Sequence, residues 1–178
     1  MEKYKARFVA KGYAQKERID YEESFAPVAR YTSIRTVISL TTQMGWKIHQ
    51  MDVKAEVLNG VIEEEVDIEF PEGFETHGKK SHVCILKKAF YGLKQAPRAW
   101  YGQIDGYLQK MGFIKSDADP NLSYLVLEYE PLILVLYVDD LFLTGSSRLI
   151  KDCKKNVAIE FDMKDLGQVH YFLGLEVW

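Results

Sequence analysis

Two adjacent carboxylates interrupt the most apolar stretch of the sequence. Residues 132–144 are hydrophobic almost throughout, yet they contain Asp139 and Asp140. Burying a lone carboxylate in apolar surroundings is prohibitively costly. The stretch therefore predicts β-structure in one of two arrangements. The two acids form a two-residue hairpin turn, where Asp is common, or they lie in a protected cleft and bind a divalent cation.

A third acid, Asp52, lies near the end of a predicted strand at residues 46–53. Taken alone, Asp52 could equally be a helix N-cap or a surface acid. Neighbouring strands lie about 4.8 Å apart, so an acid at a strand end can reach a pair at a hairpin tip. Three carboxylates suit Mg²⁺, which takes its remaining ligands from water and substrate phosphates. Two such ions would activate an attacking 3′-hydroxyl and stabilise a leaving pyrophosphate.

The order of predicted elements indicates an α+β fold, with helices packed on one face of an antiparallel sheet. Apolar spacing predicts helices from Thr32 to Gly45, from Pro97 to Gly112 and from Arg148 to Phe161. Strands are predicted at 7–10, 46–53, 83–86, 122–129 and 132–144, and two short strands around Gly174.

Length and composition fit one compact intracellular domain, either alone or with a subdomain. The chain has 178 residues, of which 47% are hydrophobic, enough to bury a core. It has two cysteines, which suits a reducing compartment. No apolar run approaches the roughly 20 residues of a membrane span, and no signal peptide opens the sequence. We therefore expect a cytoplasmic or nuclear protein.

Charge is distributed unevenly along the chain, although its formal net value is only −3. Residues 1–18 carry six bases and two acids, residues 51–75 carry nine acids and one base, and residues 79–100 carry six bases and no acid. One interpretation is three solvated faces. The other is two basic segments that flank a site for a polyanion.

Several short motifs, in order, resemble copia-type LTR-retrotransposon reverse transcriptases over essentially the whole chain. The central one is Tyr137-Val-Asp-Asp140. The others are Lys-Ala-Arg-Phe-Val-Ala-Lys-Gly at 5–12, Ser-Phe-Ala-Pro-Val-Ala-Arg at 24–30, Gln-Met-Asp-Val-Lys at 50–54, Leu-Asn-Gly at 58–60, Tyr-Gly-Leu-Lys-Gln-Ala-Pro-Arg-Ala-Trp at 91–100 and Phe-Leu-Gly-Leu-Glu-Val at 172–177.

The resemblance implies an RNA-directed DNA polymerase core with a right-hand polymerase palm and partial fingers. Residues 1–30 and 60–99 would be fingers, and residues 31–59 and 100–178 would be palm. Asp52, Asp139 and Asp140 match the residues that bind two Mg²⁺ ions. The expected partners are an RNA or DNA template with its primer and deoxynucleoside triphosphates. The thumb and the RNase H domain of the parent polyprotein are expected to be absent.

The resemblance also implies substrate contacts for further residues. Tyr137 would lie beside the primer end, and Gln95 would touch the sugar of the incoming nucleotide. Lys5, Arg7 and Lys11 are candidates to bind its triphosphate. The predicted hairpin that would grip the primer contains Phe172, Leu173, Gly174, Leu175 and Glu176.

Two positions depart from the family pattern. Val57 replaces an aromatic residue that excludes a 2′-hydroxyl by its bulk, so we expect weaker rejection of ribonucleotides. Glu56 adds an anion that either turns out to solvent or points into the nucleotide pocket. At 4 Å and an effective dielectric near 20, such a repulsion is about 4 kcal/mol. A truncated polymerase copy is the expectation; the alternatives are a non-catalytic nucleic-acid-binding module and an inert retrotransposon remnant.

Overall fold

The computed structural model describes residues 4, 7–54, 60–62, 64–70, 73–74, 83–169, 171–172 and 175–176, with Phe172 and Leu175 described by their backbone alone. The chain forms two compact units, each made of two segments. Unit 1 comprises Met1–Ala26 and Val57–Gln103, and unit 2 comprises Pro27–Glu56 and Ile104–Trp178. These divisions lie a few residues from the boundaries expected between fingers and palm.

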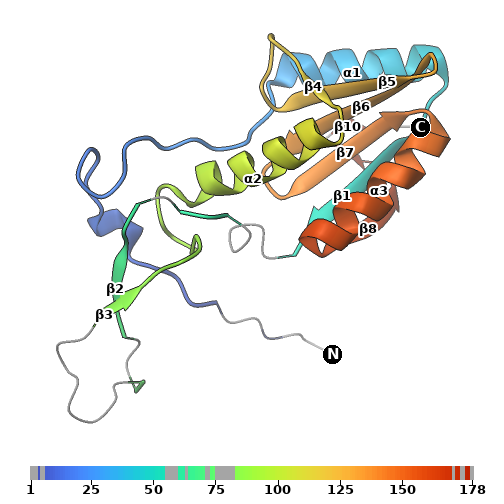
Figure 1. Ribbon diagram of the computed structural model, residues 1–178. Helices are drawn as coiled ribbons and strands as arrows, with labels where there is room; N and C mark the ends of the chain where they lie inside the picture. Colours follow the sequence, from blue (N-terminus) through green and yellow to red (C-terminus); the bar gives the residue numbers. More distant parts are fainter. Residues whose placement is uncertain are drawn as a thin grey trace. The chain divides into compact units, whose positions relative to one another are not determined.

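Unit 2 is built on a six-stranded antiparallel sheet in the order β4-β5-β6-β7-β1-β8 (Figure 1). The strands are β1 (Ile48–Val53), β4 (Ile114–Lys115), β5 (Leu122–Leu127), β6 (Glu130–Tyr137), β7 (Asp140–Gly145) and β8 (Met163–Gln168). Because β1 pairs with both β7 and β8, an early segment of the chain lies between two late ones. This insertion brings Asp52 beside the β6–β7 hairpin.

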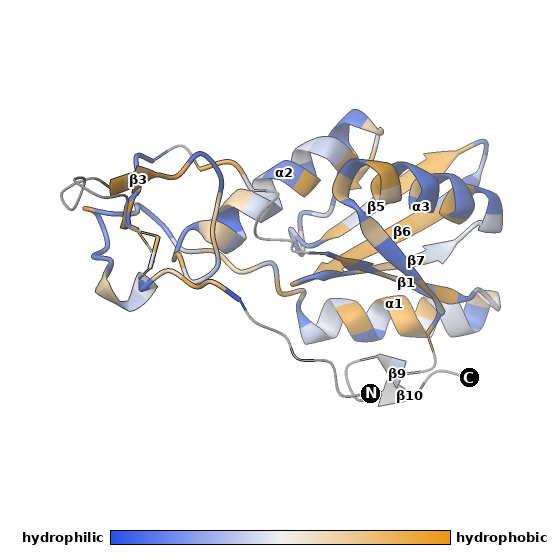
Figure 2. Ribbon diagram, turned by 90° about the horizontal axis from the view of Figure 1, so that it is seen from below, coloured by the Kyte–Doolittle hydropathy of each residue, from blue (hydrophilic) through white to orange (hydrophobic). Residues whose placement is uncertain are grey.

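Helices cover both faces of this sheet, so the expectation of helices on one face is wrong. Helix α1 (Tyr31–Met44) packs through Ile34 and Val37 against Val135 and Phe142. Helix α3 (Ser147–Phe161) and the end of α2 (Ala96–Lys110) lie on the opposite side (Figure 2). The reason is visible in residues 132–136, which are apolar without alternation. Such strands require cover on both faces.

The opposite face has an equally buried apolar layer. Its central side chains come from successive strands and are at most 1% exposed; they are Leu132, Leu134, Leu141, Leu143 and Met51. From α3, Val157 is fully buried, and the ring of Phe161 meets that of Tyr107 on α2 at 5.2 Å between centroids. None of the described helices is long and apolar enough to cross a membrane.

Unit 1 has little regular structure and a small core. It contains the short helix η1 (Gly12–Ala14), the β2–β3 hairpin (Asp67–Glu69 with Val83–Ile85) and the start of α2. Among its described residues, one cluster of buried apolar side chains comprises Ile62, Val66, Ala89, Leu93 and Ala96. The strand expected at residues 7–10 is absent. The Ala10 N–H donates to the Tyr91 carbonyl at 2.7 Å and the Ala10 carbonyl accepts the Gly12 N–H at 2.9 Å, but these bonds do not form a ladder.

The first segment of unit 1 is held by a close approach between two glycines. A Cβ atom at Gly12 would collide with the carbonyl oxygen of Gly92, and one at Gly92 would collide with that of Ala10. Gly92 also has a φ of +91°, which side chains rarely adopt. Arg7 lies over the ring of Tyr91, 5.3 Å from its centroid. The two basic segments of the sequence thus meet along this contact.

Candidate active site

The β6–β7 hairpin turns at Val138 and Asp139, and Tyr137 pairs with Asp140 to close it. The interpretation in which both acids form the turn is therefore wrong by one residue, because Asp140 begins β7. Val138 has a φ of +54°. This conformation is strained for a β-branched residue and is typical of functional sites.

Backbone bonds from two other segments hold the hairpin tip. The Val138 N–H donates to the Pro27 carbonyl at 2.6 Å, and Val28 forms a β-bridge with Tyr137. From β1, the Val53 N–H donates to the Asp139 carbonyl at 3.0 Å. These bonds, which join distant parts of the chain, fix the strained turn in place.

A buried acid that the sequence analysis missed anchors the segment carrying Pro27. Asp119 is 1% exposed; its Oδ2 accepts the Arg30 N–H at 2.7 Å, and its Oδ1 accepts the Asn121 N–H at 3.0 Å. The Asn121 carbonyl in turn accepts the Leu136 N–H of β6 at 2.8 Å. The Asp119–Asn121 bond has the spacing of an Asx-turn, which the local sequence could have indicated.

The strand register brings the three candidate acids to one end of the sheet. Asp52 is the direct partner of Asp140 across β1 and β7. Opposed residues of an antiparallel pair lie on the same face, with Cβ atoms about 4.5–5.5 Å apart. Asp139 precedes Asp140 on the turn, and Tyr137 faces Asp140 from β6. The sequence prediction that Asp52 approaches the 139–140 pair is confirmed at the level of the backbone.

The donor set fits a magnesium ion in its chemistry, because Mg²⁺ prefers carboxylate oxygens. However, in the part of the chain that the structure describes, no three His, Cys, Asp or Glu side chains form a group that could hold a metal ion. The backbone thus brings three suitable ligands to one end of the sheet, but their side chains do not converge on one point. Their side chains would have to rotate before they could share a cation.

Asp140 has a perturbed carboxyl group. Partial burial raises its pKa, and the charge of Asp52 raises it further, while a hydrogen bond from Gln50 lowers it. In that bond Gln50 Nε2 donates to Asp140 Oδ1 at 2.8 Å. The net pKa is raised, mainly because partial burial disfavours the charged carboxylate. No local signal in the sequence indicates this role of Gln50, because its partner Asp140 lies 90 positions away.

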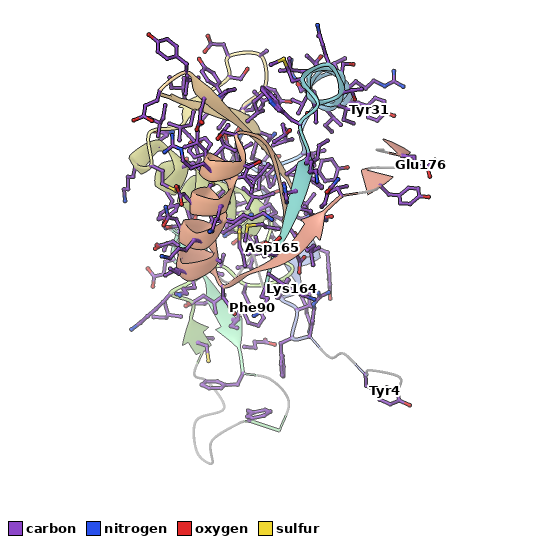
Figure 3. All side chains as sticks on the ribbon, turned by 90° about the vertical axis from the view of Figure 1, so that its right-hand side faces the viewer. Tyr4, Tyr31, Phe90, Lys164, Asp165 and Glu176 are labelled. Carbon is purple, nitrogen blue, oxygen red and sulfur yellow. The ribbon has the colours of Figure 1, made fainter. Side chains whose placement is uncertain are left out.

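On the other side of β1, Lys164 of β8 is the direct partner of Asp52 and is exposed. Figure 3 labels Lys164 and its neighbour Asp165 on this strand. Lys164, Asp52, Asp140 and Tyr137 therefore form one cross-strand row on a single face. Lys164 was missed because β8 was not predicted.

The nucleotide-binding candidates of unit 1 differ in accessibility. Gln95 is 2% exposed; its Oε1 accepts from Gln15 Nε2 at 3.0 Å, and its Nε2 donates to the Asp20 carbonyl at 3.4 Å. Both polar atoms of its side-chain amide thus form hydrogen bonds within unit 1. Arg7 and Lys11 are exposed, and Arg7 also lies over the ring of Tyr91.

Comparison with known proteins identifies the family. The reverse transcriptase (RNA-dependent DNA polymerase) family matches residues 1–178. The chain belongs to the reverse transcriptase family. A retrovirus-related Pol polyprotein from transposon TNT 1-94 of Nicotiana tabacum is 45% identical over 98% of this chain and 13% of its own length. The corresponding polyprotein from transposon RE1 of Arabidopsis thaliana is 41% identical over 99% of this chain and 12% of its own length.

This reverse transcriptase chain thus spans about one-eighth of the length of those two retrotransposon polyproteins. No solved structure gives a significant match. The recognition of a copia-type reverse transcriptase from short ordered motifs is confirmed at the level of the family.

Several candidate residues of the reverse transcriptase lie outside the described residues: Lys5, Glu56, Val57, Leu173 and Gly174. The two short strands expected near the end are present as β9 (Tyr171–Phe172) and β10 (Leu175–Glu176), with Phe172 paired to Leu175. The Tyr171 hydroxyl donates to Glu176 Oε1 at 2.9 Å across this hairpin. Its function as a primer grip stays a prediction.

Proposed function

We propose that this chain is the catalytic core of an RNA-directed DNA polymerase, with unit 1 as partial fingers and unit 2 as the palm. The observation that supports this most is the register of β1 and β7, which sets Asp52 opposite Asp140 with Asp139 on the adjoining turn. Membership of the reverse transcriptase family supports the same reaction class. The reaction is transfer of a nucleotide to a primer 3′-hydroxyl.

In this proposal Asp52, Asp139 and Asp140 would hold two Mg²⁺ ions. When bound, such ions would activate the 3′-hydroxyl and stabilise the leaving pyrophosphate. The chain itself holds the acids in place. Backbone bonds to Pro27 and from Val53 fix the turn, and partial burial of Asp140 strengthens its electrostatic interactions.

The substrate contacts proposed for the remaining residues follow the family resemblance. Arg7 and Lys11, with Lys5, would bind the triphosphate, and Gln95 would contact the sugar. Tyr137 and the β9–β10 hairpin would hold the primer. For Gln95 this requires its amide to exchange its bonds to Gln15 and Asp20. At Val57 we expect weaker rejection of ribonucleotides, and Val57→Phe should restore it in a matched incorporation assay.

A primer-extension assay on an RNA template tests the proposed reaction. Wild type should extend the primer with Mg²⁺ and not without it, and Asp139→Asn should abolish extension. Asp152→Asn, an exposed acid on α3, is the matched control and should behave as wild type. Extension that persists in EDTA, or in Asp139→Asn, would overturn the mechanism.

A non-catalytic nucleic-acid-binding module is the second candidate, because the three acids form no ready ligand group in the structure. This candidate predicts RNA binding by gel shift that neither Mg²⁺ nor Asp139→Asn alters, together with no extension by wild type. A chain that neither extends nor binds would be an inert remnant.

A further inference from the structure

We propose that Gln50 is a positioning residue that orients the carboxylate of Asp140 for metal binding. This inference rests on the function proposed above. Gln50 Nε2 donates to Asp140 Oδ1 at 2.8 Å in a partly buried setting. The bond occupies one carboxylate oxygen and restricts rotation of the group. In this proposal the other oxygen, Oδ2, is the one that binds the metal.

The register explains why a glutamine at this position can reach Asp140. Gln50 lies two residues before Asp52 on β1, so both side chains are on one face. Its direct partner on β7 is Phe142, which makes Asp140 its diagonal neighbour. Diagonal neighbours lie about 7–8 Å apart, a gap that long side chains can bridge. Asparagine is one methylene shorter and should fall short.

Strand β8 is irregular at the position opposite Gln50. The β1–β8 register shifts between Gln50, which pairs with Gly167, and Met51, which pairs with Asp165. Leu166 is thus the extra residue of a β-bulge. Gly167, the direct partner of Gln50 on β8, has a φ of +84° and no side chain. Gln50 thus has no side chain directly opposite it on β8, and its amide bonds to Asp140 on β7 instead.

Ionic contacts from α3 hold this bulge in shape. Asp165 Oδ1 accepts the Gly167 N–H at 2.8 Å. Lys154 Nζ donates to both Asp165 oxygens, at 2.7 and 2.9 Å, and meets His49 Nδ1 at 3.0 Å. The Lys154 side chain is only 14% exposed. The partly buried Lys154 thus fixes Asp165, which in turn fixes the bulge opposite Gln50.

The chemistry of the amide suits this role. A neutral N–H donor orients a carboxylate without cancelling its charge, so the carboxylate keeps its attraction for a cation. A lysine in the same place would compete with the metal, and a glutamate would repel Asp140. Residues that hydrogen-bond to metal ligands in this way typically contribute 10–100-fold to metal affinity or activity.

Binding of Mn²⁺, a spectroscopic substitute for Mg²⁺, tests the inference directly. We would titrate the full chain with Mn²⁺ and measure the free ion by electron paramagnetic resonance. Gln50→Met keeps the length of the side chain and removes the donor, so it should weaken binding about 10-fold. Gln50→Asn should weaken it similarly. Gln43→Ala, at an exposed position on α1, is the control and should bind as wild type.

A second readout separates positioning from general damage. In primer extension, Gln50→Met should raise the Mg²⁺ concentration for half-maximal rate about 10-fold, with a much smaller change in the rate at saturating metal. A variant that merely folds poorly would lose rate at every metal concentration and would show a lower unfolding midpoint. That result, with unchanged Mn²⁺ affinity, would overturn the positioning role.

Asp140→Asn distinguishes failure of this inference from failure of the proposed function. If Asp140→Asn loses Mn²⁺ binding while Gln50→Met and Gln50→Asn bind as wild type, the metal site stands and the role of Gln50 is wrong. If Asp140→Asn binds as tightly as wild type, the proposed metal site is wrong and the inference falls with it.

Discussion

Val138 shows how a single residue can be held in an unfavourable conformation by its neighbours. Its φ of +54° places a β-branched side chain where glycine is preferred. The bonds to Pro27 and from Val53 to Asp139 over-determine the turn and so maintain it. The strain therefore lies within the hairpin that carries Asp139.

Replacing Val138 by glycine should relieve this strain. Strain of this kind costs about 1–3 kcal/mol, whereas glycine costs about 1 kcal/mol in unfolded-state entropy. We expect Val138→Gly to range from neutral to about 2 kcal/mol stabilising. Val126→Gly, at an exposed position of β5, is the control and should lose about 1 kcal/mol. Equal losses in urea unfolding of the two variants would contradict the presence of strain.

His49 should make stability depend on mildly acidic pH. Burial, and next the charge of Lys154, lower its pKa from 6.5. The unfolded chain then binds a proton more readily than the folded chain in the window between the lowered pKa and about 6.5. The free energy of unfolding therefore falls as pH drops through that window.

We expect His49→Gln to remove this part of the pH dependence. Urea unfolding at pH 7.5 and pH 5 should show a smaller loss in the variant than in wild type. The two proteins share every other titrating group, so the difference isolates His49. Identical losses would show that His49 titrates normally in the folded chain.

Among the secondary-structure elements, the three long helices could be predicted from the spacing of hydrophobic residues within each segment. The helices α1, α2 and α3 begin and end within about two residues of their expected positions. Strand β8 was missed, because Met163 is its one buried residue and a bulge at Gly167 breaks the alternation. The cover on both faces was also missed, although the uninterrupted apolar run of β6 indicated it.

The candidate site likewise contains residues that a local motif indicates and residues that only contacts distant in sequence reveal. Asp52, Asp139 and Asp140 were found from local motifs, since the motif itself specifies their residue types. Gln50 was not found, because its role depends on a contact with a residue 90 positions away in the sequence. For Asp119 the Asx-turn to Asn121 is local, whereas its bond to Arg30 spans 89 positions. Such pairings are set by strand register, which no single segment reveals.

The contact between Gly12 and Gly92 should be essential to unit 1. Gly12→Ala places a Cβ atom against a carbonyl oxygen, and overpacking of this kind costs about 1–3 kcal/mol. Gly102→Ala on α2 is the matched control, because nothing lies within 4 Å of its Cβ position. It should gain about 1 kcal/mol from helix propensity.

Hydrogen exchange provides the measurement at this contact. In Gly12→Ala, the Ala10 amide, which bonds to the Tyr91 carbonyl, should exchange faster than in wild type. In Gly102→Ala its exchange should be unchanged or slower. Unaltered protection of Ala10 in Gly12→Ala would show that the two backbones can separate without loss.

At the scale of the whole molecule, a small net charge conceals a segment suited to polyanions. Residues 79–100 have no acid, and within them Lys87, Lys88 and Lys94 are exposed in unit 1. If these lysines contact phosphates, each contact releases a counterion and steepens the salt dependence of binding. The solvated-face interpretation predicts no such effect.

The double variant Lys87→Gln, Lys88→Gln should flatten this dependence. For a single strand, each lost phosphate contact changes the slope of log K against log salt by about 0.7. We therefore expect a change of about 1.4 for the pair. The matched control is Lys151→Gln with Lys155→Gln, both exposed on α3. Equal slopes for the two double variants would favour the solvated-face interpretation.

The position of β1 between β7 and β8 has a consequence for synthesis on the ribosome. Strand β1 leaves the exit tunnel long before β7 and β8 have been translated. Its backbone amides therefore stay without their strand partners until roughly a hundred further residues have been synthesised. Non-local pairing of this kind slows folding and leaves strand edges open to aggregation. A nascent chain halted before Met163 would carry Asp52 on an edge, and such truncated products should be the first to recruit chaperones.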